Sequence, residues 1–263
     1  MFTGIIVGTG KVTKLDQKTK NRSAIQMTVN LGKYAKGLRI GQSVAINGVC
    51  LSATKISKNN LVLEIGTGRG ILIPYLVETG ARIISIENDK KLFHEMMEKF
   101  GNLDNLNLKY GDGFKINQNF SILVSNLPYS QSRTAVEWLL QKKFTRAIVM
   151  LQKDFVQKLV ESGKNRRAIS ILTDYGFNIE ILKHVKKYNF SPIPKIDSVI
   201  IQIKQKQQLK KELILNVNKL FSYRRKTVQN ILRQFGVRST SKKRLDELSG
   251  DEIIKIAQKI IRS

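Results

Sequence analysis

Strand-like and helix-like segments alternate without a break between residues 61 and 162 of this chain of 263 residues. Short apolar runs predict buried strands, and amphipathic stretches, two of them ended by glycine, predict the helices between the strands. The strands are expected at 61–66, 81–87, 106–112, 120–126 and 145–151, and the helices at 71–80, 89–101, 131–141 and 153–162. This alternation is typical of βαβ units, so we expect an α/β fold with a doubly wound, mostly parallel sheet.

The first strand runs into a glycine-rich loop, EIGTGRG, which contains Glu64, Gly66, Gly68 and Gly70. Glycines allow a tight turn and a close approach of the backbone to a ligand, although such a loop also occurs as an ordinary strand-to-helix turn. The second strand ends at Glu87, 21 residues after Gly66. An acid at this spacing can bind the two hydroxyls of a ribose, and a solvated helix-capping acid is the plainer alternative.

The third and fourth strands also end in residues suited to binding a nucleoside. Asp112 lies between two glycines, where its carboxylate can accept a hydrogen bond from an adenine amine. The fourth strand ends in Asn126, Leu127, Pro128 and Tyr129, because proline cannot donate to a ladder. The Asn126 side-chain oxygen and the Pro128 carbonyl can both accept from an exocyclic amine, and Tyr129 can stack on an extruded base. The alternative is a simple turn that ends the strand, with Tyr129 in the core.

The net charge points to a polyanionic partner. The chain has 46 Lys and Arg against 20 Asp and Glu, a net charge of +26. Residues 1–60 hold ten basic residues and one acid, 61–205 hold 21 and 14, and 206–263 hold 15 and five. An excess of this size increases self-repulsion, so nucleic acid is a better explanation than a lysine-rich composition without a partner.

Several classes of protein are disfavoured by what the sequence contains. The single cysteine, Cys50, excludes an intramolecular disulfide and a multi-cysteine zinc site, and it fits a reducing cytosol. The two histidines, His94 and His184, lie far apart and form no metal or triad pattern. No apolar run has the length of a membrane span, and no signal-peptide pattern is present. We therefore expect a cytoplasmic monomer with no metal and no membrane partner.

The last part of the chain, residues 206–263, predicts a separate small helical unit. The segment RRKTVQNILRQFG (224–236) has an apolar face and ends at a glycine, which predicts a helix over this range. Its basic residues lie on another surface, where we expect phosphate contacts rather than a merely solvated face: Arg224, Arg225, Lys226 and Arg233. Ser249 and Glu252 predict a capping box for the final helix.

Residues 61 to about 262 resemble the small-subunit ribosomal RNA adenine dimethyltransferases. The matching segments are VLEIGTGRG, IISIENDKKL, GDG, VSNLPYS, VMLQKDFVQKL, FSPIPKIDSVI, FSYRRKTVQNIL and RLDELSGDEI. The resemblance implies a Rossmann-like sheet over residues 61–205 that uses S-adenosylmethionine to dimethylate two neighbouring adenines near the 3′ end of the RNA, with residues 126–129 as the catalytic loop. We expect the cofactor to be bound by Glu64, Gly66, Gly68, Glu87, Asp112 and Asn126.

Residues 1–60 depart from that family. MFTGIIVGTGKV and IGQSVAINGVCLSAT resemble the opening of riboflavin synthase, whose six-stranded barrels bind lumazine, and they cover only part of one barrel. We expect a β-rich appendage in place of the Gln-Asn-Phe-Leu-type leading segment of the dimethyltransferases. Three interpretations follow: an active dimethyltransferase, favoured by the intact strand-end motifs; an RNA-binding ribosome assembly factor without turnover; and a lumazine-binding protein of the flavin pathway.

Overall fold

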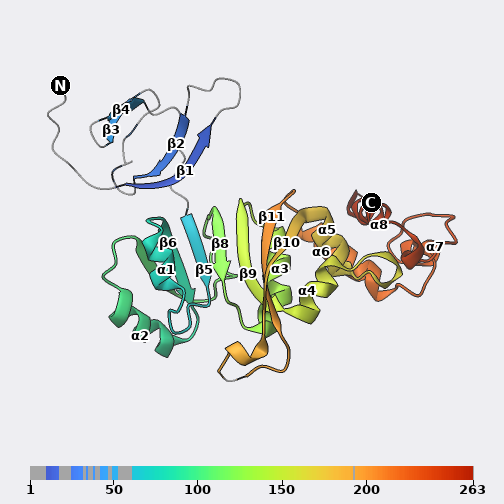
Figure 1. The fold of residues 1–263 in the computed structure, drawn as a ribbon. Helices are drawn as coiled ribbons and strands as arrows, with labels where there is room; N and C mark the ends of the chain where they lie inside the picture. The colour runs from blue at the N-terminus through green and yellow to red at the C-terminus, as the bar shows by residue number, and fades with distance from the viewer. Residues whose placement is uncertain are drawn as a thin grey trace.

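A computed structural model describes residues 10–17, 25–31, 34, 38, 42–46, 49–52, 61–191 and 193–262. The main body is a seven-stranded sheet with helices packed on it, and the described N-terminal residues form two small sheets of their own (Figure 1). None of the helices in these ranges has the length and apolar character needed to cross a membrane.

The seven strands follow the order β10-β11-β9-β8-β5-β6-β7 across the sheet. Their bounds are β5 (Leu61–Ile65), β6 (Arg82–Glu87), β7 (Leu106–Tyr110), β8 (Ile122–Ser125), β9 (Arg146–Gln152), β10 (Phe177–Val185) and β11 (Ser198–Gln205). The strands β5 to β9 are parallel, whereas β10 and β11 are antiparallel to their neighbours. Each of the five predicted strands is present, and the predicted mostly parallel sheet is confirmed.

The strand order reverses at β5. The chain first moves from β5 to β6 and β7 on one side, and then returns to β8 and β9 on the other side. In open α/β sheets, ligands bind at such a reversal, outside the carboxyl ends of the strands. The topology therefore predicts a ligand site where β5 and β8 end.

Both faces of the sheet are apolar and covered. The neighbouring residues Val62 and Leu63 of β5 are buried in two separate hydrophobic clusters, because successive side chains of a strand point to opposite faces. The helices that follow the strands are α1 (Ile73–Glu78), α2 (Lys90–Phe100), α3 (Ser132–Leu140), α4 (Lys153–Val160) and α5 (Ala168–Gly176). Asp89 caps α2, since its carboxylate accepts two backbone N–H groups of the first helical turn.

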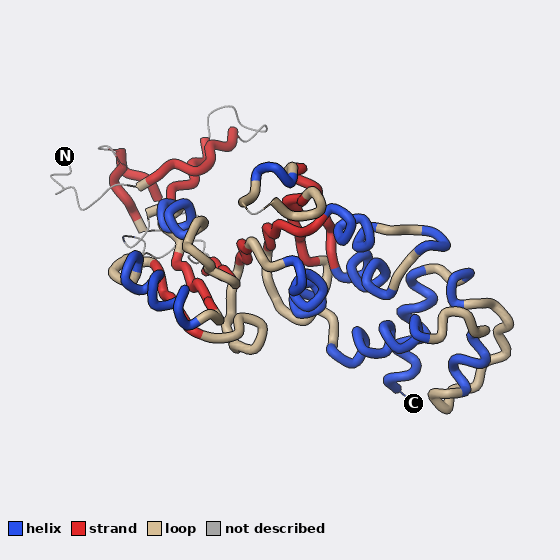
Figure 2. The backbone as a smooth tube through the Cα atoms, turned by 90° about the horizontal axis from the view of Figure 1, so that it is seen from below, coloured by secondary structure: helices blue, strands red, loops and turns tan. Residues whose placement is uncertain are grey.

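Three further helices gather at the C-terminal end of the molecule (Figure 2). They are α6 (Lys211–Ser222), α7 (Val228–Arg233) and α8 (Gly250–Arg262). Their buried side chains belong to the same hydrophobic cluster as Leu63 of β5, on one face of the sheet. The predicted capping box of α8 is confirmed: Ser249 N donates to Glu252 Oε2 at 2.6 Å, and Glu252 N donates to Ser249 Oγ at 3.1 Å.

The helix predicted over 224–236 is shorter than expected. Residues 224–226 form a turn, in which Lys226 N donates to Tyr223 O at 2.8 Å, and α7 begins only at Val228. Thr227 has an extended backbone with a ψ of 153° and forms an isolated bridge with Arg244, so helical hydrogen bonding cannot begin before it. The predicted start at residue 224 was wrong.

The N-terminal part is rich in strands within its described residues. Strand β1 (Lys11–Gln17) pairs with β2 (Ile25–Asn30), and β3 (Ser43–Ile46) pairs with β4 (Val49–Ser52), both in antiparallel fashion. Neither pair is hydrogen-bonded to the seven-stranded sheet. The expectation of a β-rich appendage is confirmed for these ranges.

Candidate active site at the carboxyl edge of the sheet

The glycine-rich loop after β5 needs its glycines for different reasons. Gly66, Gly68 and Gly70 all have positive φ angles, of 78°, 56° and 72°, a region that residues with a Cβ rarely adopt. At Gly70 a Cβ would lie 2.6 Å from Met96 Sδ, so this glycine also lets α2 pack closely. At Gly68 a Cβ would meet nothing within 4 Å, so this part of the loop faces open space.

Glu87, at the end of β6, is tied to the glycine-rich loop. Its side chain is buried, and its Oε2 accepts a hydrogen bond from Gly68 N at 2.7 Å. Its Oε1 accepts from Asn88 N and Asp89 N, both at 2.9 Å. These three hydrogen bonds fix the orientation of the carboxylate. Because a carboxylate has about four acceptor positions, about one remains for a ligand hydroxyl.

A buried polar network lies beneath the same loop. Glu64 is only 1% exposed, and its Oε2 accepts from Ser85 Oγ at 2.6 Å, while Ser85 is hydrogen-bonded in turn to Thr67. Burial raises the pKa of Glu64 from 4.5 to about 7, and the nearby charge of Glu87 contributes in the same direction. Ser85 and Thr67 were not predicted from the sequence to belong to this network. The signal for Ser85 was a serine inside the otherwise apolar run of β6.

The NLPY segment after β8 lies directly against the glycine-rich loop. Ser125 Oγ donates to the carbonyl of Ile65, which joins the end of β8 to the end of β5. A Cβ at Gly66 would lie 3.9 Å from both Leu127 Cδ2 and Pro128 Cδ. Leu127 is buried in the core and anchors the segment, whereas its neighbours Asn126 and Pro128 are exposed.

The Pro128 carbonyl, one of the two acceptors predicted for an adenine amine, already has one partner. It accepts a hydrogen bond from Gln131 N at 2.9 Å, in the short turn that leads into α3. A carbonyl oxygen has two lone pairs, so one remains for a ligand amine.

Tyr129 is held by a residue that the sequence analysis did not single out. Its hydroxyl is hydrogen-bonded to Ser198 Oγ at 2.5 Å, and Ser198 is fully buried at the start of β11. Ser198 is far from Tyr129 in sequence, and only the pairing of β11 with β9 brings it to this edge. The serine stands in the quoted segment FSPIPKIDSVI, but nothing in that pattern indicated which side chain it would contact.

Asp112 completes the edge on the side of β7. Its Oδ1 accepts from Phe114 N at 2.9 Å, its Oδ2 pairs with Lys115 Nζ at 3.4 Å, and its side chain is 42% exposed. A Cβ at Gly113 would lie 2.6 Å from Ile65, so the GDG turn is packed against the end of β5. The structure thus brings together all four strand ends that the sequence analysis singled out.

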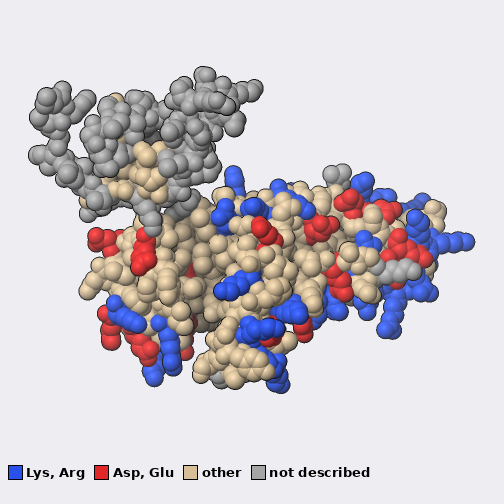
Figure 3. All heavy atoms as spheres, viewed as in Figure 1, with Lys and Arg blue, Asp and Glu red and all other residues tan. Residues whose placement is uncertain are grey.

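The basic residues predicted to bind RNA lie elsewhere. Arg224, Arg225, Lys226 and Arg233 are all exposed, on the turn before α7 and on α7 itself. Figure 1 shows α7 at the opposite end of the molecule from α2, and Figure 3 shows many Lys and Arg side chains over this C-terminal part. These residues do not lie at the strand ends that form the candidate site.

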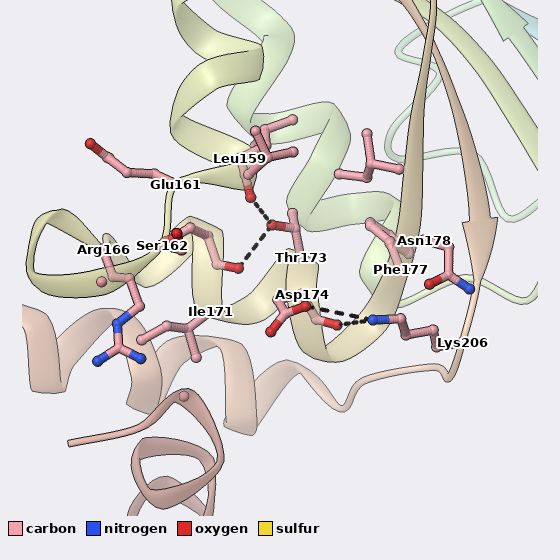
Figure 4. A pocket seen from close by; sticks show the side chains of 15 residues that line it. Leu159, Glu161, Ser162, Arg166, Ile171, Thr173, Asp174, Phe177, Asn178 and Lys206 are labelled. Carbon is pink, nitrogen blue, oxygen red and sulfur yellow. Dashed lines mark hydrogen bonds and ion pairs between the residues drawn. The ribbon is translucent and has the colours of Figure 1, made fainter.

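A cavity of about 400 Å³ lies at the other edge of the sheet, between α4, α5 and the first residues of β10 (Figure 4). Some of the polar groups that line it are already paired: Thr173 Oγ1 donates to Leu159 O at 2.6 Å, and Lys206 pairs with Asp174 at 3.6 Å. No residue from the candidate site lines this cavity. Among the residues that the structure describes, no group of three or more His, Cys, Asp or Glu could hold a metal ion.

Comparisons with known proteins agree with this geometry. The family model described as "Ribosomal RNA adenine dimethylase" matches residues 42–259, and the model described as "Lumazine binding domain" matches residues 3–67. The ribosomal RNA small subunit methyltransferase A of Thermotoga maritima is 31% identical over 224 residues, which are 80% of this chain and 78% of that protein. The protein of the same name from Thermotoga neapolitana is 32% identical over 248 residues, 85% of this chain and 93% of that protein.

Solved structures show the same fold. A dimethyladenosine transferase from Plasmodium falciparum has a TM-score of 0.63 at 22% identity, covering 77% of this chain and 90% of that one. The 23S rRNA methyltransferase ErmE has a TM-score of 0.56 at 19% identity, covering 77% and 91%. The methyltransferase fold inferred from the sequence is therefore confirmed, and both family resemblances are matched by family models. The chain belongs to the ribosomal RNA adenine dimethylase family.

Proposed function

We propose that this chain transfers methyl groups from S-adenosylmethionine to the N6 atoms of two adjacent adenines near the 3′ end of small-subunit ribosomal RNA. The observation that carries this proposal is the meeting of four strand ends at the reversal of the sheet. The glycine-rich loop contacts Glu87 on one side and the NLPY segment on the other, and the GDG turn packs against the same strand, β5. Family membership supports the same reaction.

The residues of the crevice fit this cofactor. The open space at Gly68 admits a ligand close to the backbone, and Glu87 keeps about one acceptor position for a ribose hydroxyl. The exposed carboxylate of Asp112 can accept from the adenine amine of the cofactor. Gly66, Asn126 and the buried Glu64 would complete the pocket. When bound, S-adenosylmethionine supplies a methyl group already activated by its sulfonium.

The NLPY segment would orient and activate the target amine. The lone pair of an adenine amine is delocalised into the ring, which makes the amine a poor nucleophile. Hydrogen bonds from its two hydrogens to the Asn126 side-chain oxygen and the Pro128 carbonyl would concentrate the lone pair on nitrogen. Tyr129, held by Ser198, would stack on the extruded base. Each transfer releases one proton from the methylated amine to water. One hydrogen remains after the first transfer, and it can bond to one of the two acceptors before the second.

The C-terminal helices are the proposed RNA-binding unit. Residues 206–263 carry a large share of the excess charge, and the exposed Arg224, Arg225, Lys226 and Arg233 would contact phosphates outside the target site. Residues 1–60 would form an appendage that makes no riboflavin, because their resemblance to riboflavin synthase covers only part of one lumazine-binding barrel. We place the chain in the cytoplasm as a monomer that acts on small ribosomal subunits.

The test is methyl transfer from labelled cofactor to small ribosomal subunits that lack the modification. Asn126→Ala should abolish transfer and lower cofactor affinity only modestly. Asn178→Ala is the matched control, because Asn178 is an exposed asparagine that lines the cavity at the other edge of the sheet. Transfer by Asn126→Ala at the wild-type rate would refute the role of this loop.

A further inference from the structure

The connection between β10 and β11 projects from the same edge of the sheet as the NLPY segment. Ser198, the first residue of β11, pairs with Gln152, the last residue of β9, and β9 runs parallel to β8. The connection therefore lies beyond the carboxyl ends of the parallel strands, where Figure 1 shows it extending away from the body of the sheet.

A single carboxylate fixes the turn at residues 186–190 in this connection. Asp197 Oδ1 accepts from Lys187 N at 3.0 Å, and its Oδ2 pairs with Lys186 Nζ at 3.2 Å. The turn is closed by Asn189 N, which donates to Lys186 O at 3.0 Å. Asp197 directly precedes Ser198, so the start of β11 holds both this turn and the hydroxyl of Tyr129.

The turn displays an aromatic ring in basic surroundings. Tyr188 is 72% exposed, and Lys187 Nζ lies 5.4 Å from the centre of its ring. Residues 183–197 contain four lysines and one acid, and that acid is Asp197, which already accepts from the turn. Exposed tyrosine beside lysines is the combination with which proteins bind single-stranded nucleic acid, because bases stack on the ring and ammonium groups contact phosphates.

We propose that Tyr188 is a second stacking surface, which takes the base of a single-stranded RNA nucleotide next to the target adenine. Lys187 and Lys195 would contact the phosphates that flank this base. The inference rests on the proposed function, because that function places the target adenine beside Tyr129 at the same edge. The lack of unpaired acids in residues 183–197 favours the RNA backbone over a basic protein surface.

The test uses a short single-stranded RNA with the fluorescent base 2-aminopurine next to an adenine. Tyr188→Ala should weaken binding of this RNA by about five- to 150-fold, the equivalent of ~1–3 kcal/mol for one stacked base, and should remove the stacking-induced quenching of 2-aminopurine. Tyr188→Phe keeps the ring and should bind within about twofold of the wild type. The matched control is Tyr75→Ala on α1, since Tyr75 is 70% exposed and distant in sequence from both tyrosines of this edge.

The outcomes separate this inference from the proposed function. Equal RNA affinity and equal quenching for Tyr188→Ala and Tyr75→Ala would overturn the inference, even if the wild type transfers methyl groups. Binding that depends on Tyr188 in a protein without methyl transfer would support the inference as a contact with RNA and refute the proposed reaction. A Tyr188→Ala variant that loses affinity for ribosomal subunits but keeps it for the RNA would show that the ring contacts a protein, and would also overturn the inference.

Discussion

Replacing Glu64 by glutamine tests the buried network beneath the glycine-rich loop. Glutamine has nearly the same shape, and its side-chain oxygen can still accept from Ser85 Oγ, the bond that measures 2.6 Å in the structure. Unlike the carboxyl group, the amide stays neutral at every pH. The variant should therefore remove the cost of ionising a group that is only 1% exposed.

The magnitude follows from the pKa of Glu64, which burial raises from 4.5 to about 7. Below the lower value the carboxyl group is protonated in both the folded and the unfolded chain, and folding carries no ionisation cost. As the pH rises the unfolded chain ionises first, so stability is lost until the pH passes the folded-state pKa. The complete loss is about 3 kcal/mol, of which ~2.5 kcal/mol falls between about pH 5 and pH 8.

The assay is urea unfolding of the wild type and Glu64→Gln at about pH 5 and pH 8, analysed as the difference in unfolding free energy between the two proteins. That difference should move in favour of the variant by about 2–3 kcal/mol on going to the higher pH. Glu98→Gln on the exposed face of α2 is the control and should show no comparable change. A difference for Glu64→Gln that does not vary with pH would refute the reasoning.

Two further predictions concern the RNA substrate. Ser198→Ala should lower kcat/KM by about fivefold, the loss expected for one hydrogen bond of ~1 kcal/mol, and combining it with Tyr129→Phe should lower kcat/KM no further than either change alone. If the losses in kcat/KM of the two single variants add fully in the double variant, Ser198 and Tyr129 do not share a role. Ser170→Ala is the control: it removes a remote buried hydroxyl and should leave the kinetics unchanged. Replacing the three basic residues at 224–226 by glutamate should weaken RNA binding. The slope of log K against the logarithm of the salt concentration should become shallower by roughly three, one for each lost phosphate contact. An unchanged slope would place the RNA on another surface.

The sequence predicted the core of the fold because its signals are local. Each parallel strand is a short apolar run, and each ends in a residue whose chemistry is visible without the structure, such as Glu87 or Asp112. Because parallel strands end at one edge of the sheet, these residues are predicted to lie close together. The structure confirms this: Gly66 lies beside the NLPY segment, Gly68 N donates to Glu87, and Gly113 packs against the end of β5.

Features that depend on long-range pairing could not be predicted in this way. Ser198 reaches Tyr129 only because β11 inserts beside β9 in antiparallel register. Thr227 pairs with Arg244, and this bridge delays the start of α7 against a continuous helical pattern in the sequence. The raised pKa of Glu64 likewise depends on complete burial by segments that are distant in sequence.

The most direct test of the central claim is mass spectrometry of small-subunit RNA after incubation of unmodified subunits with this chain and labelled S-adenosylmethionine. The proposed function predicts two labelled methyl groups on each of two adjacent adenines near the 3′ end, and the role proposed for the NLPY segment predicts none with Asn126→Ala. Unlabelled adenines after incubation with a folded wild-type protein, or label on any other base, would contradict the account.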